Sequence, residues 1–116
     1  MGKEKKGIPR HYSDTMSEHP KVYQALETLG KIIRQEGPLD GKTTHLIQLA
    51  AAASVRSEGS VHSHTRRALE AGVTPEEIRH AILLLVSTIG YPTTAAALCW
   101  VNDVLKGRKG RRQKRQ

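Results

Sequence analysis

The sequence predicts an all-α protein, a single oligomeric domain of five helices, and three observations support this class. Five segments repeat apolar residues at the three- and four-residue spacing of a helix face, and Gly or Pro separates them. A run of four alanines at 50–53 and the scarcity of aromatic residues indicate a core of small and aliphatic side chains. A chain of 116 residues builds one domain with a modest core, which self-association would enlarge.

The first two expected helices have clear boundaries. The first runs from about Pro20, a residue that suits a first helical position, to a Gly37-Pro38 stop signal. Its apolar residues at helical spacing are Val22, Leu26, Leu29 and Ile33. The second helix opens after Asp40, which can cap it, and contains the alanine run 50–53. Because small side chains let a neighbouring helix approach closely, we expect this helix to be tightly packed.

The third and fourth helices are expected at about residues 58–71 and from residue 75 to Gly90. The third is polar at its start, and Gly72 follows its end, where a left-handed residue is common. The fourth opens with a Thr74-Pro75-Glu76-Glu77 segment. In this capping box Thr74 caps the helix and Glu77 reaches back to it.

The fifth helix is expected to start near Thr93 or Thr94, just after Pro92, and to end near Gly107. The fourth and fifth helices are apolar on almost every side, above all at residues 81–86 and 95–101, so that Cys99 is expected to pack. A helix that is apolar all round is buried all round, which a small monomer can hardly achieve. We therefore expect a subunit interface.

Positive charge is concentrated at the two ends of the chain. The formal net charge is +8, and residues 106–116 hold seven Lys and Arg residues with no acid. We expect a basic N-terminal arm at 1–12, a helical domain at 13–106 and a disordered basic tail at 107–116. The tail would attract nucleic acid non-specifically, although a solubilising tail is the plainer interpretation.

The remaining composition limits the compartment and the chemistry. Cys99 is the only cysteine, so an intrachain disulfide is excluded, and we expect a cytoplasmic protein. The lysine-rich start has no apolar run behind it, unlike a secretory signal. Apolar stretches such as 81–86 and 95–101 are far too short to cross a bilayer, so no membrane partner is expected.

Three stretches resemble the carboxymuconolactone decarboxylase and alkyl hydroperoxidase D family. The first, residues 39–50, begins Leu-Asp-Gly-Lys-Thr and ends Leu-Ile-Gln-Leu-Ala. The second, residues 64–78, consists of His-Thr-Arg-Arg-Ala-Leu-Glu-Ala-Gly followed by Val-Thr-Pro-Glu-Glu-Ile. The third, residues 90–97, reads Gly-Tyr-Pro-Thr-Thr-Ala-Ala-Ala. The resemblance implies the helical fold of that family and assembly as a homotrimer or homohexamer.

The peroxidase branch of the family carries Cys-x-x-Cys-x-x-x-His with a Glu twelve residues before the first Cys. The matching positions are Ser57, Ser60, His64 and His45. Serine cannot supply the thiolate nucleophile or the resolving thiol of that chemistry. The resemblance therefore implies a member without dithiol peroxidase activity, and a peroxidase-type oxidoreductase stays the alternative within the family.

The decarboxylase branch lacks the cysteine pair and keeps a histidine, and its substrate is a lactone that bears carboxylates. His64, Arg66, Arg67 and the start of the third helix could supply an acid and carboxylate partners. We expect a decarboxylase-like protein that binds or transforms a small anionic molecule. A non-catalytic interaction protein with nucleic-acid-binding tails is the rival from another class.

The candidate catalytic residues are His64, Ser60, Ser57, His45 and Glu58, with no cofactor and no metal expected. Ser60 and His64 share a helix face, but a nucleophile pair would need an orienting group and an oxyanion hole. His64 could also be a buried, hydrogen-bonded histidine, and Glu58 could simply favour the helix dipole. A metal held by His45, Glu58 and either His62 or His64 is the weaker alternative.

Overall fold

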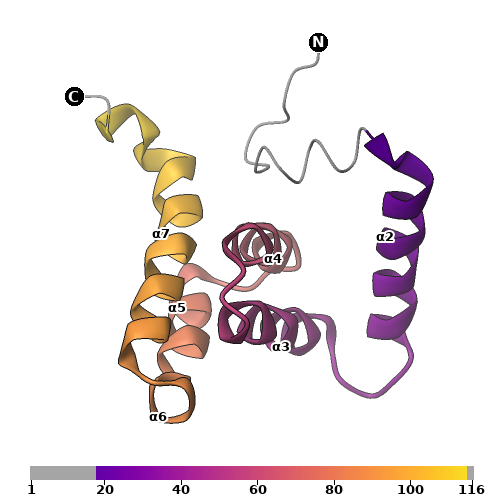
Figure 1. Ribbon diagram of the computed structural model, residues 1–116, viewed down its shortest axis with the longest axis horizontal. Coiled ribbons are helices and arrows are strands. Elements are labelled where there is room, and N and C mark those ends of the chain that lie inside the picture. Colours follow the sequence, from indigo (N-terminus) through magenta and orange to yellow (C-terminus); the bar gives the residue numbers. More distant parts are fainter. Residues whose placement is uncertain (1–17, 115–116) are drawn as a thin grey trace.

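The computed structural model describes the backbone of residues 18–114 and the side chains of residues 18–107, and the all-α class is confirmed. Its helices are α2 (Pro20–Gln35), α3 (Gly41–Ser54), α4 (Glu58–Glu70), α5 (Pro75–Leu83), α6 (Val86–Ile89) and α7 (Tyr91–Lys114). In Figure 1, α3 and α4 lie side by side in the middle, with α5 and α7 on one flank and α2 on the other.

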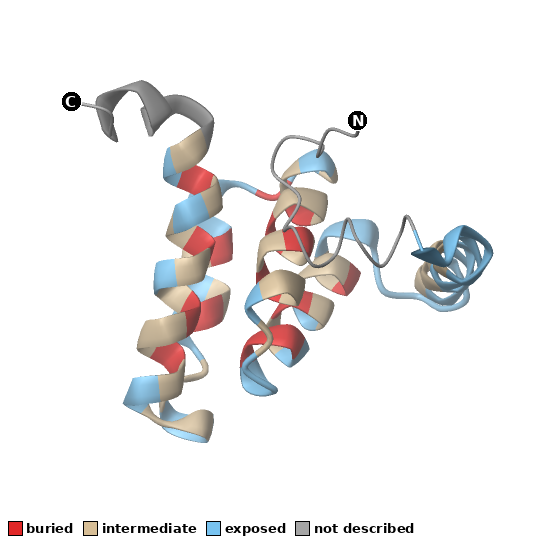
Figure 2. Cartoon of the chain, turned by 45° about the horizontal axis from the view of Figure 1, so that its top comes forward, coloured by how far each residue is buried: buried red, intermediate tan, exposed pale blue. Residues whose placement is uncertain are grey.

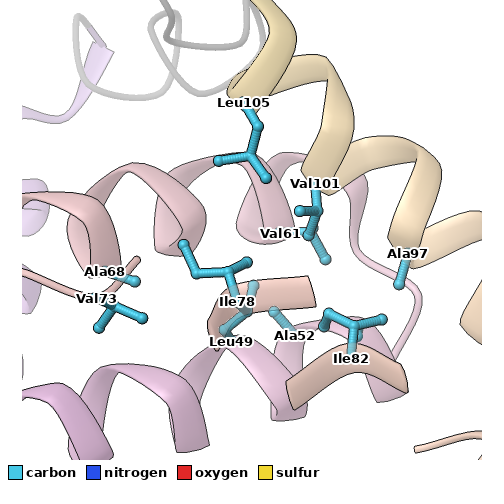
Figure 3. Packing of buried hydrophobic residues seen from close by; sticks show 11 residues of the cluster. Leu49, Ala52, Val61, Ala68, Val73, Ile78, Ile82, Ala97, Val101 and Leu105 are labelled. Carbon is cyan, nitrogen blue, oxygen red and sulfur yellow. The ribbon is translucent and has the colours of Figure 1, made fainter. Parts of the chain in front are cut away.

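The core lies where α3, α4, α5 and α7 meet (Figure 3). Aliphatic side chains from all four helices are fully buried there, among them Leu49, Val61, Ile78, Ile82 and Val101. Ala52 and Ala53 from the alanine run are also buried, so α4 can pack closely on α3. Burial of these side chains is the main driving force that fixes the register of α4 against its neighbours.

The helix starts follow the capping signals in the sequence. The Asp40 carboxylate accepts a hydrogen bond from the Thr43 amide at 2.8 Å, which begins α3. The Thr74 hydroxyl accepts from the Glu77 amide at 3.1 Å, and the Glu77 carboxylate accepts from the Thr74 amide at 2.9 Å. The expected capping box is therefore present at the start of α5.

A tight corner joins α3 to α4 and sets where α4 begins. Arg56 has a φ of 56°, in the left-handed region, and its amide donates to the Ala53 carbonyl. The next amide, that of Ser57, donates to the Ala52 carbonyl, which completes a Schellman ending. The Arg56 guanidinium donates to the Thr93 hydroxyl at 3.0 Å, a contact that ties the corner to α7.

Three helix boundaries differ from the prediction. The expected fourth helix divides into α5 and α6, where the Leu85 amide donates to Ile82, three residues back, and no Pro or Gly marks the change. Helix α7 begins at Tyr91 rather than Thr93, since a proline at 92 fits inside a first helical turn. Its backbone stays helical to Lys114, past the expected end at Gly107.

Helix α2 has no buried residue (Figure 2), and its partly covered side is polar while its exposed side is largely apolar. Tyr23, Glu27, Gly30 and Arg34, which recur at helical spacing, are the residues that are partly covered. On the opposite side, large apolar side chains are about half exposed: Val22, Leu26, Leu29, Ile32 and Ile33. The periodicity predicted this helix correctly, but its apolar face is not part of the core of the single chain.

Several expectations concern the ends and the surface of the chain. Cys99, expected to pack, is exposed on α7, which is a correction. The tail at 107–116 was expected to be disordered, but its described backbone continues α7 as far as Lys114. The N-terminal arm at 1–12 and the side chains from residue 108 onward lie outside the described part. In the portion that the structure describes, every helix is too short or too polar to cross a membrane.

Candidate functional site

A cavity of about 630 Å³ lies between the inward side of α2 and the neighbouring faces of α3 and α4. Its walls are mainly polar and charged: Tyr23, Glu27, Lys31, Arg34, His45, Ser63, Arg66, Arg67, Glu70 and Ala71. Four of these residues are basic and two are acidic, so the cavity has an excess of positive charge. A small anion is the class of molecule that such a cavity attracts.

An ion pair between α2 and α4 forms one wall of the cavity. The Arg67 guanidinium donates to both oxygens of the Glu27 carboxylate, and its Nε donates to the Ser63 hydroxyl at 3.2 Å. The hydrogen bond from Arg67 holds the pKa of Glu27 below its usual value. Bidentate pairing of this kind fixes the orientation of both side chains, so it sets the position of α2 over α4.

Arg34 brings a second guanidinium from α2 to the cavity. Its Nη1 donates to the side-chain carbonyl of Gln48 on α3 at 3.3 Å. Gly30, one turn earlier, leaves room for this arrangement, since a Cβ there would lie 3.2 Å from the same Nη1 atom. A glycine in the middle of a helix costs helix stability, and here it allows the guanidinium to lie along the helix.

His45 of α3 and His64 of α4 come together beside these cations. The Nδ1 atoms of both rings are buried and have no hydrogen-bond partner among the described residues. Burial lowers the pKa of His64 to about 4, and the nearby Arg67 and His45 add to this effect. Burial also lowers the pKa of His45, with Arg34 and Arg67 contributing. Both rings are therefore neutral at pH 7.

A buried ring nitrogen without a partner is costly, and such atoms concentrate where a ligand completes the bonding. A neutral imidazole can accept a proton or donate one from its other nitrogen. Bound negative charge next to these rings would favour their protonated forms. The arrangement can therefore hold an anion and exchange a proton with it.

The structure divides the five candidate residues into separate groups. His45 lines the cavity, and His64 lies close enough to it for the two rings to influence each other. Ser57 is the N-cap of α4, and its hydroxyl accepts from the Ser60 amide at 3.4 Å. Glu58 is exposed and lies near His62 instead, with 4.0 Å between Oε2 and Nε2. Neither serine nor Glu58 lines the cavity.

Sequence reasoning named Arg66 and Arg67 as carboxylate partners, and both line the cavity. It missed the contribution of α2, because a polar stripe on an amphipathic helix normally faces solvent. The missed residues are Tyr23, Glu27, Lys31 and Arg34 of α2, together with Ser63, Glu70 and Ala71 in or just after α4. One signal was present: Gly30 lies in the interior of a helix between Glu27 and Arg34, where an ordinary surface helix has no use for it.

The profile of the carboxymuconolactone decarboxylase family matches residues 20–103. This chain belongs to that family. The match takes in α2 to α6, most of the described part of α7, and every residue that lines the cavity. The resemblance seen in the sequence is therefore confirmed, and so is the all-α fold of the family.

Two relatives found by sequence similarity are each named only as an uncharacterized protein. A protein of Haemophilus influenzae is 31% identical over 61 residues, which are 53% of this chain and 54% of that protein. A protein of Methanocaldococcus jannaschii is 32% identical over 73 residues, which are 63% of this chain and 68% of that protein. The chain thus spans about half the length of the first relative and two thirds of the second. Neither name specifies a substrate.

Proposed function

We propose that this family member binds a small carboxylate-bearing molecule in the cavity between α2, α3 and α4. The observation that carries the proposal is the pair of partly buried histidines, whose buried Nδ1 atoms have no partner among the described residues, beside an excess of basic residues. Guanidinium groups bind carboxylates through charge-assisted hydrogen bonds. Arg34 and the residues around it would hold the carboxylate against His45 and His64.

The proposed chemistry is proton transfer to the bound molecule, in a decarboxylase-like reaction. Loss of carbon dioxide from a carboxylate leaves an electron pair on carbon, and a proton must then be delivered there. An anion bound beside His45 and His64 would raise the pKa of these rings and let one of them carry that proton. The thiol route is not part of the proposal, because Ser57 caps α4 and Cys99 lies exposed on α7.

Self-association is the second part of the proposal. The outward face of α2 exposes Leu26, Leu29 and Ile33 by about half, and Leu83 and Leu84 of the α5–α6 junction are similarly exposed. Exposed apolar side chains that recur along one face of a helix, as on α2, are typical of a subunit interface. A second copy seated on α2 would press this helix onto α4 and close the cavity, so we infer that the homo-oligomer is the form that binds the anion.

Calorimetric titration with small mono- and dicarboxylates tests the binding proposal. The parent should bind at least one of them, and Arg34→Gln should weaken that binding roughly tenfold or more, since the carboxylate would lose a charged, partly covered partner. Lys21→Gln is the matched control, because Lys21 is exposed on the same helix and does not line the cavity. Equal binding by both variants, or none by the parent, would reject the proposal.

A further inference from the structure

A second cluster of chemically active side chains lies on the α4–α7 surface. Glu58 and His62, four residues apart, share one face of α4, and Asp103 approaches them from α7. The His62 Nε2 atom is 3.1 Å from Asp103 Oδ2 and 4.0 Å from Glu58 Oε2. All three donor atoms lie within 4.8 Å of one another. None of these three residues lines the anion cavity.

We propose that Glu58, His62 and Asp103 form a binding site for a divalent transition-metal ion. One imidazole nitrogen and two carboxylate oxygens are a donor set that Zn²⁺ uses. Around a tetrahedral Zn²⁺, with bonds of about 2.0–2.2 Å, neighbouring donors are separated by roughly 3.4 Å. The distances from His62 Nε2 to Asp103 Oδ2, 3.1 Å, and to Glu58 Oε2, 4.0 Å, lie on either side of that value. Small side-chain rotations would therefore bring the three donors into place.

The protein core holds the two helices that carry these donors. Val61, next to His62, is fully buried, and so is Val101, two residues before Asp103. The register of α4 against α7 is therefore set by packing, and no helix has to move for the donors to converge. The side chain of His62 is 17% exposed, while those of Glu58 and Asp103 are more than half exposed. An ion can thus reach the donors from solvent.

Charge favours a cation at this point. Two carboxylates so close together repel each other, and a divalent ion would neutralise both. The imidazole nitrogen disfavours Mg²⁺ and Ca²⁺, which prefer oxygen donors alone. Among transition-metal ions, the affinity of the site should increase from Mn²⁺ to Co²⁺ to Zn²⁺. Three protein donors leave at least one position for water. The ion would join α4 to α7 on the surface next to the core.

The test is a titration of the full chain with Zn²⁺ by calorimetry and with Co²⁺ by visible absorption. The parent should bind one ion per chain, and His62→Gln, Glu58→Gln and Asp103→Asn should each weaken binding roughly tenfold or more. Three controls should bind as the parent does: His80→Gln and Glu76→Gln, which remove exposed groups elsewhere, and Cys99→Ser. Circular dichroism verifies that each variant is folded.

The same titrations distinguish this site from other places in the protein where the ion could bind. Binding that survives all three site variants would overturn the proposal, as would a parent that binds no ion at micromolar concentration. Loss of binding in Cys99→Ser would place the ion on the exposed thiol. Loss in His45→Gln or His64→Gln, with the three site variants unchanged, would place it in the anion cavity. Both results contradict the site described here.

Discussion

Arg67 of α4 and Glu27 of α2 form a bidentate ion pair, and this pair places the polar side of α2 over the anion cavity. Beside this pair, α2 has polar contacts such as the Arg34–Gln48 hydrogen bond but no buried side chain, and its apolar side faces outward. The position of the helix thus depends on polar contacts rather than on core packing.

Breaking this pair should loosen α2. In Glu27→Gln the Arg67 charge loses its carboxylate, and the free energy of unfolding should fall by about 1 kcal/mol, a modest value because solvent reaches the pair. The segment 36–40 between α2 and α3 should become more sensitive to protease. Glu36→Gln is the control, because Glu36 is exposed and outside the cavity. Equal protease sensitivity in both variants would mean that the pair does not hold α2.

The stability of the protein should depend on pH through His64. Its pKa is about 4 in the folded chain and 6.5 in the unfolded chain, so between these values only the unfolded chain takes up the proton. Stability is therefore full above pH 6.5 and falls as the pH is lowered toward 4. After allowance for solvent near the ring, the loss should be roughly 1–2 kcal/mol.

Urea unfolding at pH 7 and pH 4.5 measures this effect. His64→Gln should lose less stability than the parent over that interval, while His80→Gln, which changes an exposed ring, should follow the parent. At pH 7, His64→Gln should be as stable as the parent or more so, because the buried Nδ1 atom has no partner to lose among the described residues. A clear loss of stability at pH 7 would instead assign His64 a structural role.

The outward face of α2 should control assembly. Leu26→Asp places a charge in the middle of the exposed apolar side chains, which would strongly oppose burial against a second copy. Light scattering after size exclusion should show an oligomer for the parent and a smaller species for the variant. Gln24→Asp, at an exposed polar position on the same helix, should leave the oligomer intact. A parent that is monomeric at micromolar concentration would contradict the inferred assembly.

Peroxide reduction that depends on a thiol should be absent. Ser57 and Ser60 stand where the peroxidase branch has its cysteines, and Cys99 is exposed on α7. A single thiol without a resolving partner cannot complete the dithiol cycle. The parent and Cys99→Ser should therefore have equal rates in a peroxide assay with dithiol reductant. A rate that disappears in the variant would restore the peroxidase alternative.

The sequence predicted the helices well because their boundaries are set locally. Asp40 caps α3 and Thr74 caps α5 through local hydrogen bonds that do not depend on which helices pack against them. Gly72 ends α4 through its own left-handed φ of 96°. The break at Leu84–Leu85 was missed, since no residue type there signals it.

The site was predicted less completely, because it depends on how helices face each other. His45 and His64 were identified through the resemblance, and the structure brings them together. Glu58 was assigned to the same site, but it lies on the face of α4 that His62 shares, toward α7. The role of α2 could not be predicted, because a periodic pattern defines two faces of a helix without specifying which one meets the protein.

The most direct test of the anion site is nitrogen NMR of the histidine rings, with and without a small dicarboxylate such as succinate at pH 7. In the ligand-free protein, His45 and His64 should show the ring-nitrogen shifts of neutral imidazole. Succinate should move the Nδ1 resonance of at least one of them toward the protonated form and leave the exposed His80 unchanged. If His64 is already protonated at pH 7, or if neither ring responds to any carboxylate that the protein binds, these histidines do not form the anion site.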